Sequence, residues 1–184
     1  MFGQEELWRY REGNRLEFKE AQGGLPRSFW ETYSSFANTQ GGLIVLGAAE
    51  KSDGTMRAIG IANLEALRRD LWGGLNNEQK VSANLLLDSD ITQESIDGKS
   101  LLLVYVPRAD RTLRPVYIND NPKRGSFRRN GDGDYHCTAE ELRAMARDSA
   151  EGATDKLVLT AIDLGRAERG DDRRVSQRVR WLPP

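Results

Sequence analysis

Residues 36–47 read FANTQGGLIVLG, and this stretch decides how the chain folds. It closes a segment in which aromatic residues recur at positions i, i+4 and i+7 from Phe29, which is one apolar face of a helix expected over residues 26–39. The two glycines permit positive φ and end that helix. The unbroken apolar run that follows at residues 43–46 is typical of a buried strand.

The junction between this helix and this strand can be interpreted in two ways. A glycine-rich turn can present backbone N–H groups to a phosphate. Here, however, the glycines follow a helix and precede a strand, which is the reverse of the order in a nucleotide-binding loop. We therefore expect Asn38 to tie the junction together through side-chain hydrogen bonds.

Strands are expected on both sides of this stretch. Residues 15–20 alternate between apolar and charged side chains. A turn at residues 52–54 should bring residues 56–61 back to pair with residues 43–46 as a hairpin. Apolar runs and alternation predict further strands at residues 85–87, 91–96, 101–106, 115–118 and 126–129.

Two more helices are expected from their capping residues. Asn63 can cap a helix that ends near residues 73–74. Thr138 and Glu141 have the spacing of a capping box at the start of another helix. The whole pattern predicts an α/β (α+β) fold, a compact mixed sheet with about three helices.

The composition is that of a globular protein in a reducing compartment. Of 184 residues, 38% are hydrophobic and 30% are charged, with a net charge of −1. No apolar run reaches the roughly 20 residues of a bilayer span and no signal-peptide core is present, so we expect a cytoplasmic protein with no membrane partner. Cys137 is the single cysteine and is expected to be a small buried hydrophobe. His136 is the single histidine, and no Gly-x-Ser-x-Gly elbow accompanies it to support a hydrolase triad.

The periodic pattern fades toward the C-terminus. We expect residues 1–150 to form the domain, and residues 151–184 to be a C-terminal tail or the start of a following module. An apolar segment at residues 157–162, together with Trp8 and Trp181, would suit a homodimer contact or a partner domain.

A basic stretch at residues 108–129 stands out from the nearly neutral whole. It holds seven cationic and two anionic side chains, a local balance of +5. Such clustering suits phosphate binding, and arginines beside strand aromatics suit contact with bases, whereas a solvated strand edge is the alternative. The residues expected to contact nucleic acid, DNA or RNA, are Arg114, Tyr117, Lys123, Arg124, Arg128 and Arg129.

Two carboxylates near the start form a second candidate site. Glu12 and Glu17 lie five residues apart, and Lys19 follows on the same predicted strand. Mg²⁺ binds few carboxylates together with water and phosphate oxygens, and metal-assisted phosphodiester cleavage needs that arrangement. The alternative, which the spacing alone favours, is that Glu17 faces solvent and pairs with Lys19 or another neighbour.

Taken in order, these segments resemble the Schlafen Alba-like domain family. The resemblance spans residues 7–147 and rests on residues 12–19 (ExxxxEFK), residues 36–47, residues 115–117, Phe127 and Arg128 with Gly131, and the closing helix from Thr138. It implies a compact α/β domain, and bacterial members of this family are usually described as DNA-binding or transcription-regulator proteins. Many members carry a further C-terminal ATPase-like or winged-helix module.

The resemblance also implies a set of catalytic residues. Some Schlafen relatives are metal-dependent RNases that use both glutamates of ExxxxEFK and an acidic residue after the glycine-rich strand. By position these are Glu12 and Glu17, with Glu50 in the third place, around Mg²⁺ or Mn²⁺, and Lys19 would steady the scissile phosphate. This chain departs from the relatives at the third acid, because it reads Ala-Ala-Glu where they often read Val-x-Asp.

Three functions therefore remain open from the sequence. The first is binding of nucleic acid, DNA in particular, by the basic stretch of a regulator-type protein. The second is a divalent-metal-dependent nuclease that acts on RNA or DNA. The third is a protein-interaction or dimerisation module.

Overall fold

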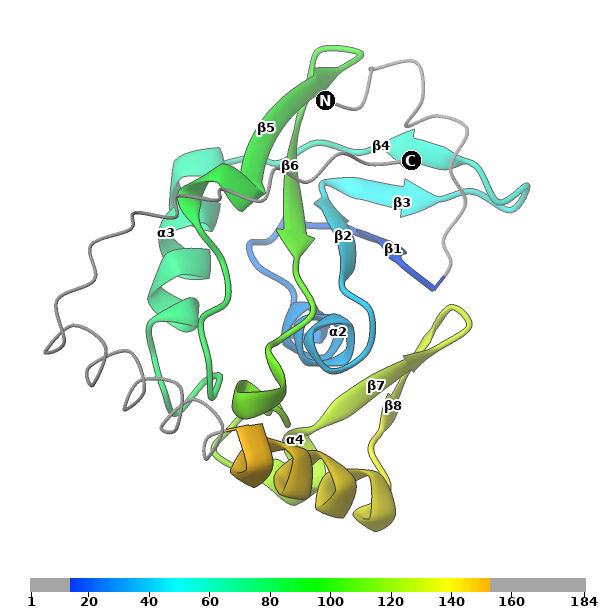
Figure 1. Ribbon diagram of the computed structural model, residues 1–184. Helices are drawn as coiled ribbons and strands as arrows, with labels where there is room; N and C mark the ends of the chain where they lie inside the picture. The colour runs from blue at the N-terminus through cyan, green and yellow to red at the C-terminus, as the bar shows by residue number, and fades with distance from the viewer. Residues whose placement is uncertain (1–13, 153–184) are drawn as a thin grey trace, which may run out of the picture.

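A four-stranded mixed sheet forms the framework of the computed structural model, which describes residues 14–152 (Figure 1). Its strand order is β1-β2-β6-β5, in which β1 and β2 run parallel and the other neighbours run antiparallel. A parallel pair needs a crossover connection, and helix α2 (Ser28–Asn38) provides it. The four strands are β1 (Leu16–Lys19), β2 (Gly42–Leu46), β5 (Ile91–Ile96) and β6 (Lys99–Val106).

Strand β2 is covered on both faces, as its apolar run predicts. Ile44 and Leu46 belong to the larger core, which α2 and α3 (Leu64–Leu75) also line. Val45 points to the opposite face and packs in a smaller core with Phe18 of β1. A strand buried on both faces needs apolar residues without alternation. The predicted strand at residues 43–46 is therefore confirmed.

A separate hairpin covers the smaller core. It consists of β3 (Ala48–Glu50) and β4 (Met56–Ala58), which pair antiparallel. The prediction that residues 56–61 pair with residues 43–46 is wrong. Gly47 has a φ of 87°, a backbone conformation that turns the chain out of the sheet, and so β2 pairs with β1 and β6 instead.

Both predicted helix caps are present. The Asn63 side chain accepts a hydrogen bond from the backbone N–H of Ala66 at 2.9 Å at the start of α3. At the C-terminal helix, the Thr138 N–H donates to Glu141 Oε2 at 2.7 Å and the Glu141 N–H donates to Thr138 Oγ1 at 3.2 Å. The described part of this helix covers residues 139–152, so it continues past the expected domain limit at residue 150. None of the helices in residues 14–152 has the length and apolar character of a bilayer span.

Three of the predicted strand segments differ in the structure. Residues 85–87 form no strand and lead into the short helix η1 (Asp88–Asp90). Residues 115–118 make only isolated bridges, from Tyr117 and Ile118. The segment at residues 126–129 is strand β7 (Phe127–Asn130), and it pairs with a strand that we did not predict, β8 (Gly133–His136). The remaining short elements are η2 (Arg111–Leu113) and α4 (Pro122–Gly125).

Helix α2 lies between the main sheet and the β7–β8 hairpin (Figure 1). Phe29, Tyr33 and Phe36 are fully buried in the larger core. The remaining side of the helix carries small polar residues, and these are buried too. The helix is therefore buried nearly all round. Its aromatic side packs in the larger core, and its polar side faces the β7–β8 hairpin.

The polar side of α2 supplies hydrogen bonds to the backbone of β7. The Phe127 N–H donates to Ser34 Oγ at 3.0 Å, and the Arg129 N–H donates to Thr39 Oγ1 at 3.0 Å. Asn38 donates through Nδ2 to the Phe127 carbonyl at 3.0 Å. A strand edge leaves backbone groups that must be paired when they are buried. Helix side chains take the place of a neighbouring strand here.

Asn38 also holds the loop that precedes α4. Its Oδ1 accepts from the Val116 N–H at 2.8 Å, and its Nδ2 donates to the Val116 carbonyl at 2.8 Å. The expected side-chain hydrogen bonds are thus present, although they reach segments far along the chain rather than closing the helix end. The two glycines after the helix have steric roles, because a Cβ on Gly42 would lie 2.6 Å from the Phe36 ring and one on Gly41 would lie 2.7 Å from the Val106 carbonyl oxygen.

We predict that Asn38→Ala destabilises the fold by roughly 2–4 kcal/mol, because it leaves buried backbone groups of Val116 and Phe127 without partners. Urea unfolding followed by circular dichroism measures this loss. Asn130→Ala is the matched control, since Asn130 is exposed on β7. Equal stability of the two variants would contradict the assignment.

Candidate functional site

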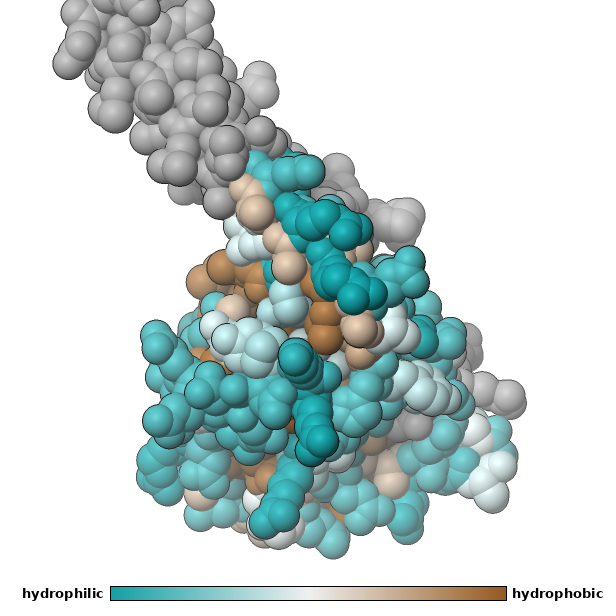
Figure 2. Space-filling view, turned by 90° about the horizontal axis from the view of Figure 1, so that it is seen from below, coloured by the Kyte–Doolittle hydropathy of each residue, from teal (hydrophilic) through white to brown (hydrophobic). Residues whose placement is uncertain are grey.

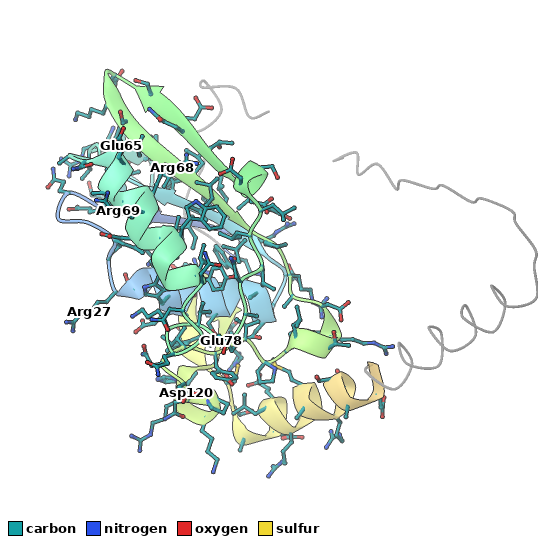
Figure 3. The ribbon with its side chains drawn as sticks, turned by 90° about the vertical axis from the view of Figure 1, so that its left-hand side faces the viewer. Arg27, Glu65, Arg68, Arg69, Glu78 and Asp120 are labelled. Atoms are coloured by element: carbon teal, nitrogen blue, oxygen red, sulfur yellow. The ribbon has the colours of Figure 1, made fainter. Side chains whose placement is uncertain are left out.

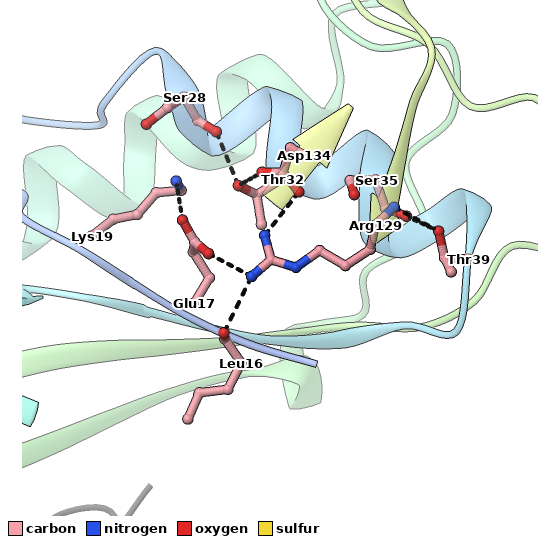
Figure 4. Close-up of polar contacts among 9 residues, drawn as sticks. All are labelled: Leu16, Glu17, Lys19, Ser28, Thr32, Ser35, Thr39, Arg129 and Asp134. Atoms are coloured by element: carbon pink, nitrogen blue, oxygen red, sulfur yellow. Dashed lines mark hydrogen bonds and ion pairs between the residues drawn. The ribbon is translucent and has the colours of Figure 1, made fainter. Parts of the chain in front are cut away.

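Four charged side chains from three strands meet beside α2 (Figure 4). Glu17 of β1 accepts at Oε1 from Lys19 Nζ at 2.9 Å and at Oε2 from Arg129 Nη2 at 2.7 Å. Arg129 Nη1 donates to Asp134 Oδ1 on β8 at 2.9 Å. Two cations and two anions balance one another, so this charge cluster (Glu17, Lys19, Arg129 and Asp134) is neutral overall.

Arg129 is the centre of the charge cluster. Its side chain is 1% exposed, and its guanidinium carbon lies 5.2 Å from the centroid of the Phe36 ring. Burial by itself lowers the pKa of Arg129, but the hydrogen bonds and negative charges of Asp134 and Glu17 outweigh it and raise the pKa above its ordinary value. Arg129 is therefore a permanent buried cation that joins the β7–β8 hairpin to β1.

The predicted metal site is only partly within the described residues. Glu17 has both carboxylate oxygens engaged by cations and is 14% exposed, so it pairs with Lys19 as the alternative expected but does not face solvent. Glu12 lies outside the described residues. Glu50 is the exposed last residue of β3. Within residues 14–152, no group of three His, Cys, Asp or Glu side chains is placed to hold a metal ion.

The basic stretch divides into paired and exposed cations. Arg129 is buried, and Arg128 forms an ion pair with Glu141 of the C-terminal helix at 3.1 Å. Lys123 and Arg124 are exposed on α4. This lower face of the molecule is mainly hydrophilic (Figure 2). Charge on α4 is thus available to a ligand, whereas the charge of Arg129 is not.

Arg114 and Tyr117 lie half-buried in the loop before α4. Burial lowers the pKa of Arg114 and the positive charge of nearby Arg108 lowers it further, while the carboxylates of Asp148 and Asp110 act in the opposite direction. The Tyr117 backbone N–H donates to Ser82 Oγ at 2.9 Å, which fixes the loop.

A pocket of about 540 Å³ opens between α4, β8 and the start of α2. The pocket was not predicted from the sequence, because strand β8, which forms one side of it, was not predicted. The two-residue loop Gly131-Asp132, with Gly131 at a φ of 64°, is the hairpin signal that could have found this strand. Residues that line the pocket include Glu31, Asn119, Asn121, Arg124, Tyr135 and His136.

Three further predicted features have different outcomes. Cys137 is buried, as expected, and burial raises the pKa of its thiol to about 11. His136 stacks on Phe127 with ring centroids 4.4 Å apart. The apolar segment at residues 157–162 and both Trp8 and Trp181 lie outside the described residues, so the docking hypothesis stays a prediction.

Comparisons with known proteins give one family match and similar solved structures, but no curated relative. The model of the Schlafen, AlbA_2 family matches residues 12–138. No curated protein matches the chain. Among solved structures, the chain is similar to the N-terminal domain of a Nitrosomonas europaea protein described as related to the ATP-dependent DNA helicase RecG, at 31% identity and a TM-score of 0.53, over 73% of this chain and 90% of that one.

A second solved structure shares the fold. It is the DIP2311 protein from Corynebacterium diphtheriae, which matches at 21% identity and a TM-score of 0.50. The alignment covers 73% of this chain and 24% of the other, so this chain spans about a quarter of the longer protein. At that identity the likeness concerns the fold alone.

We predict that Arg129→Met lowers the free energy of unfolding by about 3 kcal/mol, because it leaves the largely buried carboxylates of Glu17 and Asp134 without their main cation. Arg128→Met is the matched control on the same strand. Its ion pair is about one-third exposed and should contribute less than about 1 kcal/mol. Chemical denaturation of both variants measures the difference, and a larger loss from Arg128→Met would refute the assignment.

Proposed function

The chain belongs to the Schlafen, AlbA_2 family, and we propose that it is a nucleic-acid-binding domain. Its similarity to a domain of a protein related to a DNA helicase supports DNA as the ligand. We further propose that the domain acts in the cytoplasm as part of a regulator-type protein, as the family resemblance implies.

The observation that carries the proposal is the exposed charge on α4. Lys123 and Arg124 are adjacent, exposed and engaged in no ion pair within residues 14–152. Phosphate contacts of this kind supply most of the affinity in binding that does not depend on sequence. Arg108 and Arg114 are the second proposed contact region, although Asp110 and Asp148 near Arg114 offset part of its charge.

The proposed contact set is narrower than the basic stretch. Arg129 cannot reach a phosphate without breaking its ion pairs with two largely buried carboxylates, and Arg128 is engaged by Glu141. We keep Tyr117 among the proposed contact residues. It is half-buried in the loop before α4 and lies next to the exposed cations. Binding through these groups depends on charge and requires no metal ion.

We do not extend the proposal to cleavage. A metal ion at Glu17 would have to displace Lys19 or Arg129 from an oxygen that each already occupies at hydrogen-bond distance. Removing a partner from a buried ion pair costs several kcal/mol. The charge cluster therefore favours a structural role for Glu17 over metal binding.

We predict that the double variant Lys123→Ala, Arg124→Ala weakens binding to all DNA sequences about equally. It should also reduce the slope of log K against log salt by about two, since each lost phosphate contact removes roughly one unit. Fluorescence anisotropy of a labelled duplex over a salt series measures both effects.

The control for this experiment removes the same charge elsewhere. Arg68 and Arg69 lie on α3 beside Glu65, at a distance from Asp120, which shortly precedes α4 (Figure 3). Arg68→Ala, Arg69→Ala should leave the salt slope unchanged. If this control weakens binding as much as the α4 variant, then only net charge matters and the site is wrong. If the wild-type chain binds no nucleic acid at low salt, the proposed function itself is wrong.

A further inference from the structure

His136 is the single histidine of the chain, and it lies on the side of the β7–β8 hairpin that faces α2. It is paired in register with Phe127, which belongs to the larger core, and cross-strand partners point to the same face of a hairpin. The centroids of the two rings are 4.4 Å apart. His136 is otherwise exposed and forms no hydrogen bond to another residue of the described range 14–152. Packing therefore holds the imidazole ring in place while its nitrogens stay available to a ligand.

Arg124 of α4 lines the same pocket as His136. The Cys137 N–H donates to the Ser126 carbonyl at 2.9 Å. This hydrogen bond joins the residue after His136 to a residue two positions after Arg124, so the two side chains start from neighbouring stretches of backbone. Asn121 also lines the pocket, and it accepts from the Arg124 N–H through Oδ1 at 3.0 Å, which leaves its Nδ2 to donate to a ligand. A guanidinium, an imidazole and an amide are thus available to one ligand.

The charges that line the pocket cancel when His136 is neutral. Arg124 contributes one positive charge, and Glu31 of α2 contributes one negative charge. Asp134 also lines the pocket, but Arg129 neutralises it through their ion pair at 2.9 Å (Figure 4). A proton on His136 therefore changes a balanced pocket into a positively charged one.

The other charged and titratable groups next to His136 do not compete with this change. Glu141 of the C-terminal helix pairs with Arg128 at 3.1 Å, on the opposite face of the hairpin. Burial raises the pKa of the Cys137 thiol to about 11, so the thiol stays neutral near pH 7. Imidazole is the only side chain whose ordinary pKa places its charge change between pH 5 and 8. Within that range the charge of the pocket therefore depends on His136.

We propose that His136 and Arg124 together bind a backbone phosphate of nucleic acid, and that a proton on His136 strengthens this binding. The proposal rests on the proposed nucleic-acid-binding function, because Arg124 belongs to its α4 contact region, and it adds a contact residue and a pH dependence. A protonated imidazole donates from both ring nitrogens and carries a positive charge, which suits a phosphate. A phosphodiester keeps its negative charge throughout this range, so the affinity should rise as the pH falls.

The test measures binding of one labelled DNA duplex to the full 184-residue chain by fluorescence anisotropy, at about pH 5.5 and about pH 7.5. The wild-type chain should bind about tenfold more tightly at the lower pH. The slope of log K against log salt should also be steeper there by about one unit, because one more cation contacts phosphate. His136→Gln should lose both differences. His136→Lys should bind tightly at both pH values, because lysine stays charged.

Matched controls separate the pocket from a general effect of charge. Added to His136→Gln, Tyr105→His places an imidazole on β6, outside the residues that line the pocket, and should not restore the pH dependence. Glu31→Gln alone should tighten binding at the higher pH, because it removes the anion that opposes Arg124.

A titration by NMR requires no variant, because the ring signals of a single histidine can be followed directly. The pH at which the His136 signals change should move upward when the duplex is added, since the bound phosphate favours the charged ring. Inorganic phosphate should have the same effect only at a far higher concentration.

Several results would overturn this inference while leaving the proposed function intact. The inference is wrong if the wild-type chain and His136→Gln show the same pH dependence, or if Tyr105→His restores it. It is also wrong if His136→Lys binds no more tightly than His136→Gln at the higher pH, if Glu31→Gln fails to tighten binding, or if the His136 signals respond to inorganic phosphate but not to the duplex. Failure of the wild-type chain to bind the duplex at either pH and low salt would instead remove the proposed function, and this inference with it.

Discussion

The hydrogen bonds between the polar side of α2 and the backbone of β7 are the constraint on which the rest of the structure depends. Ser34, Asn38 and Thr39 satisfy strand groups that would otherwise be buried without partners. They fix where β7 lies, and the register of the hairpin then fixes β8. The charge cluster and the pocket beside α4 both take side chains from this hairpin, so both depend on small polar residues that touch no ligand.

The charge cluster is the second connection between the β7–β8 hairpin and the rest of the fold. Arg129 reaches from β7 past the side of α2 to Glu17 on β1. Buried ion pairs stabilise little on balance, yet they penalise any arrangement that leaves one partner alone. The cluster therefore specifies one position of the hairpin against the sheet. This role uses Glu17, one of the three carboxylates expected to hold a metal ion, and Lys19 of the same segment.

Residue spacing and turn residues predicted individual helices and strands correctly where these depend on nearby residues. The aromatic spacing from Phe29 and the glycines at residues 41 and 42 predicted α2 and its end, and the buried run predicted β2. Pairing partners were less predictable, because Gly47 redirects the chain through a single backbone angle and no propensity reveals which strand lies next to β2. Within the site, the contact between Glu17 and Lys19 follows from spacing along a strand. The contact of Glu17 with Arg129 joins residues 112 positions apart, so the sequence around either residue does not predict it.

That separation has a consequence for how the molecule assembles. The contacts of α2 with the loop before α4 and with β7 join residues 78 to 93 positions apart. Contacts of such long range are entropically costly to close and form slowly compared with local ones. During synthesis on the ribosome, the residues of α2 emerge well before those of β7. Until β7 has been made, the polar side of α2 is exposed to water. Ser, Asn and Thr side chains are well hydrated when they are exposed. Apolar side chains at the same positions would promote association with other chains before folding is complete. The chemistry that holds the finished hairpin is thus also suited to a helix that spends part of synthesis half-covered.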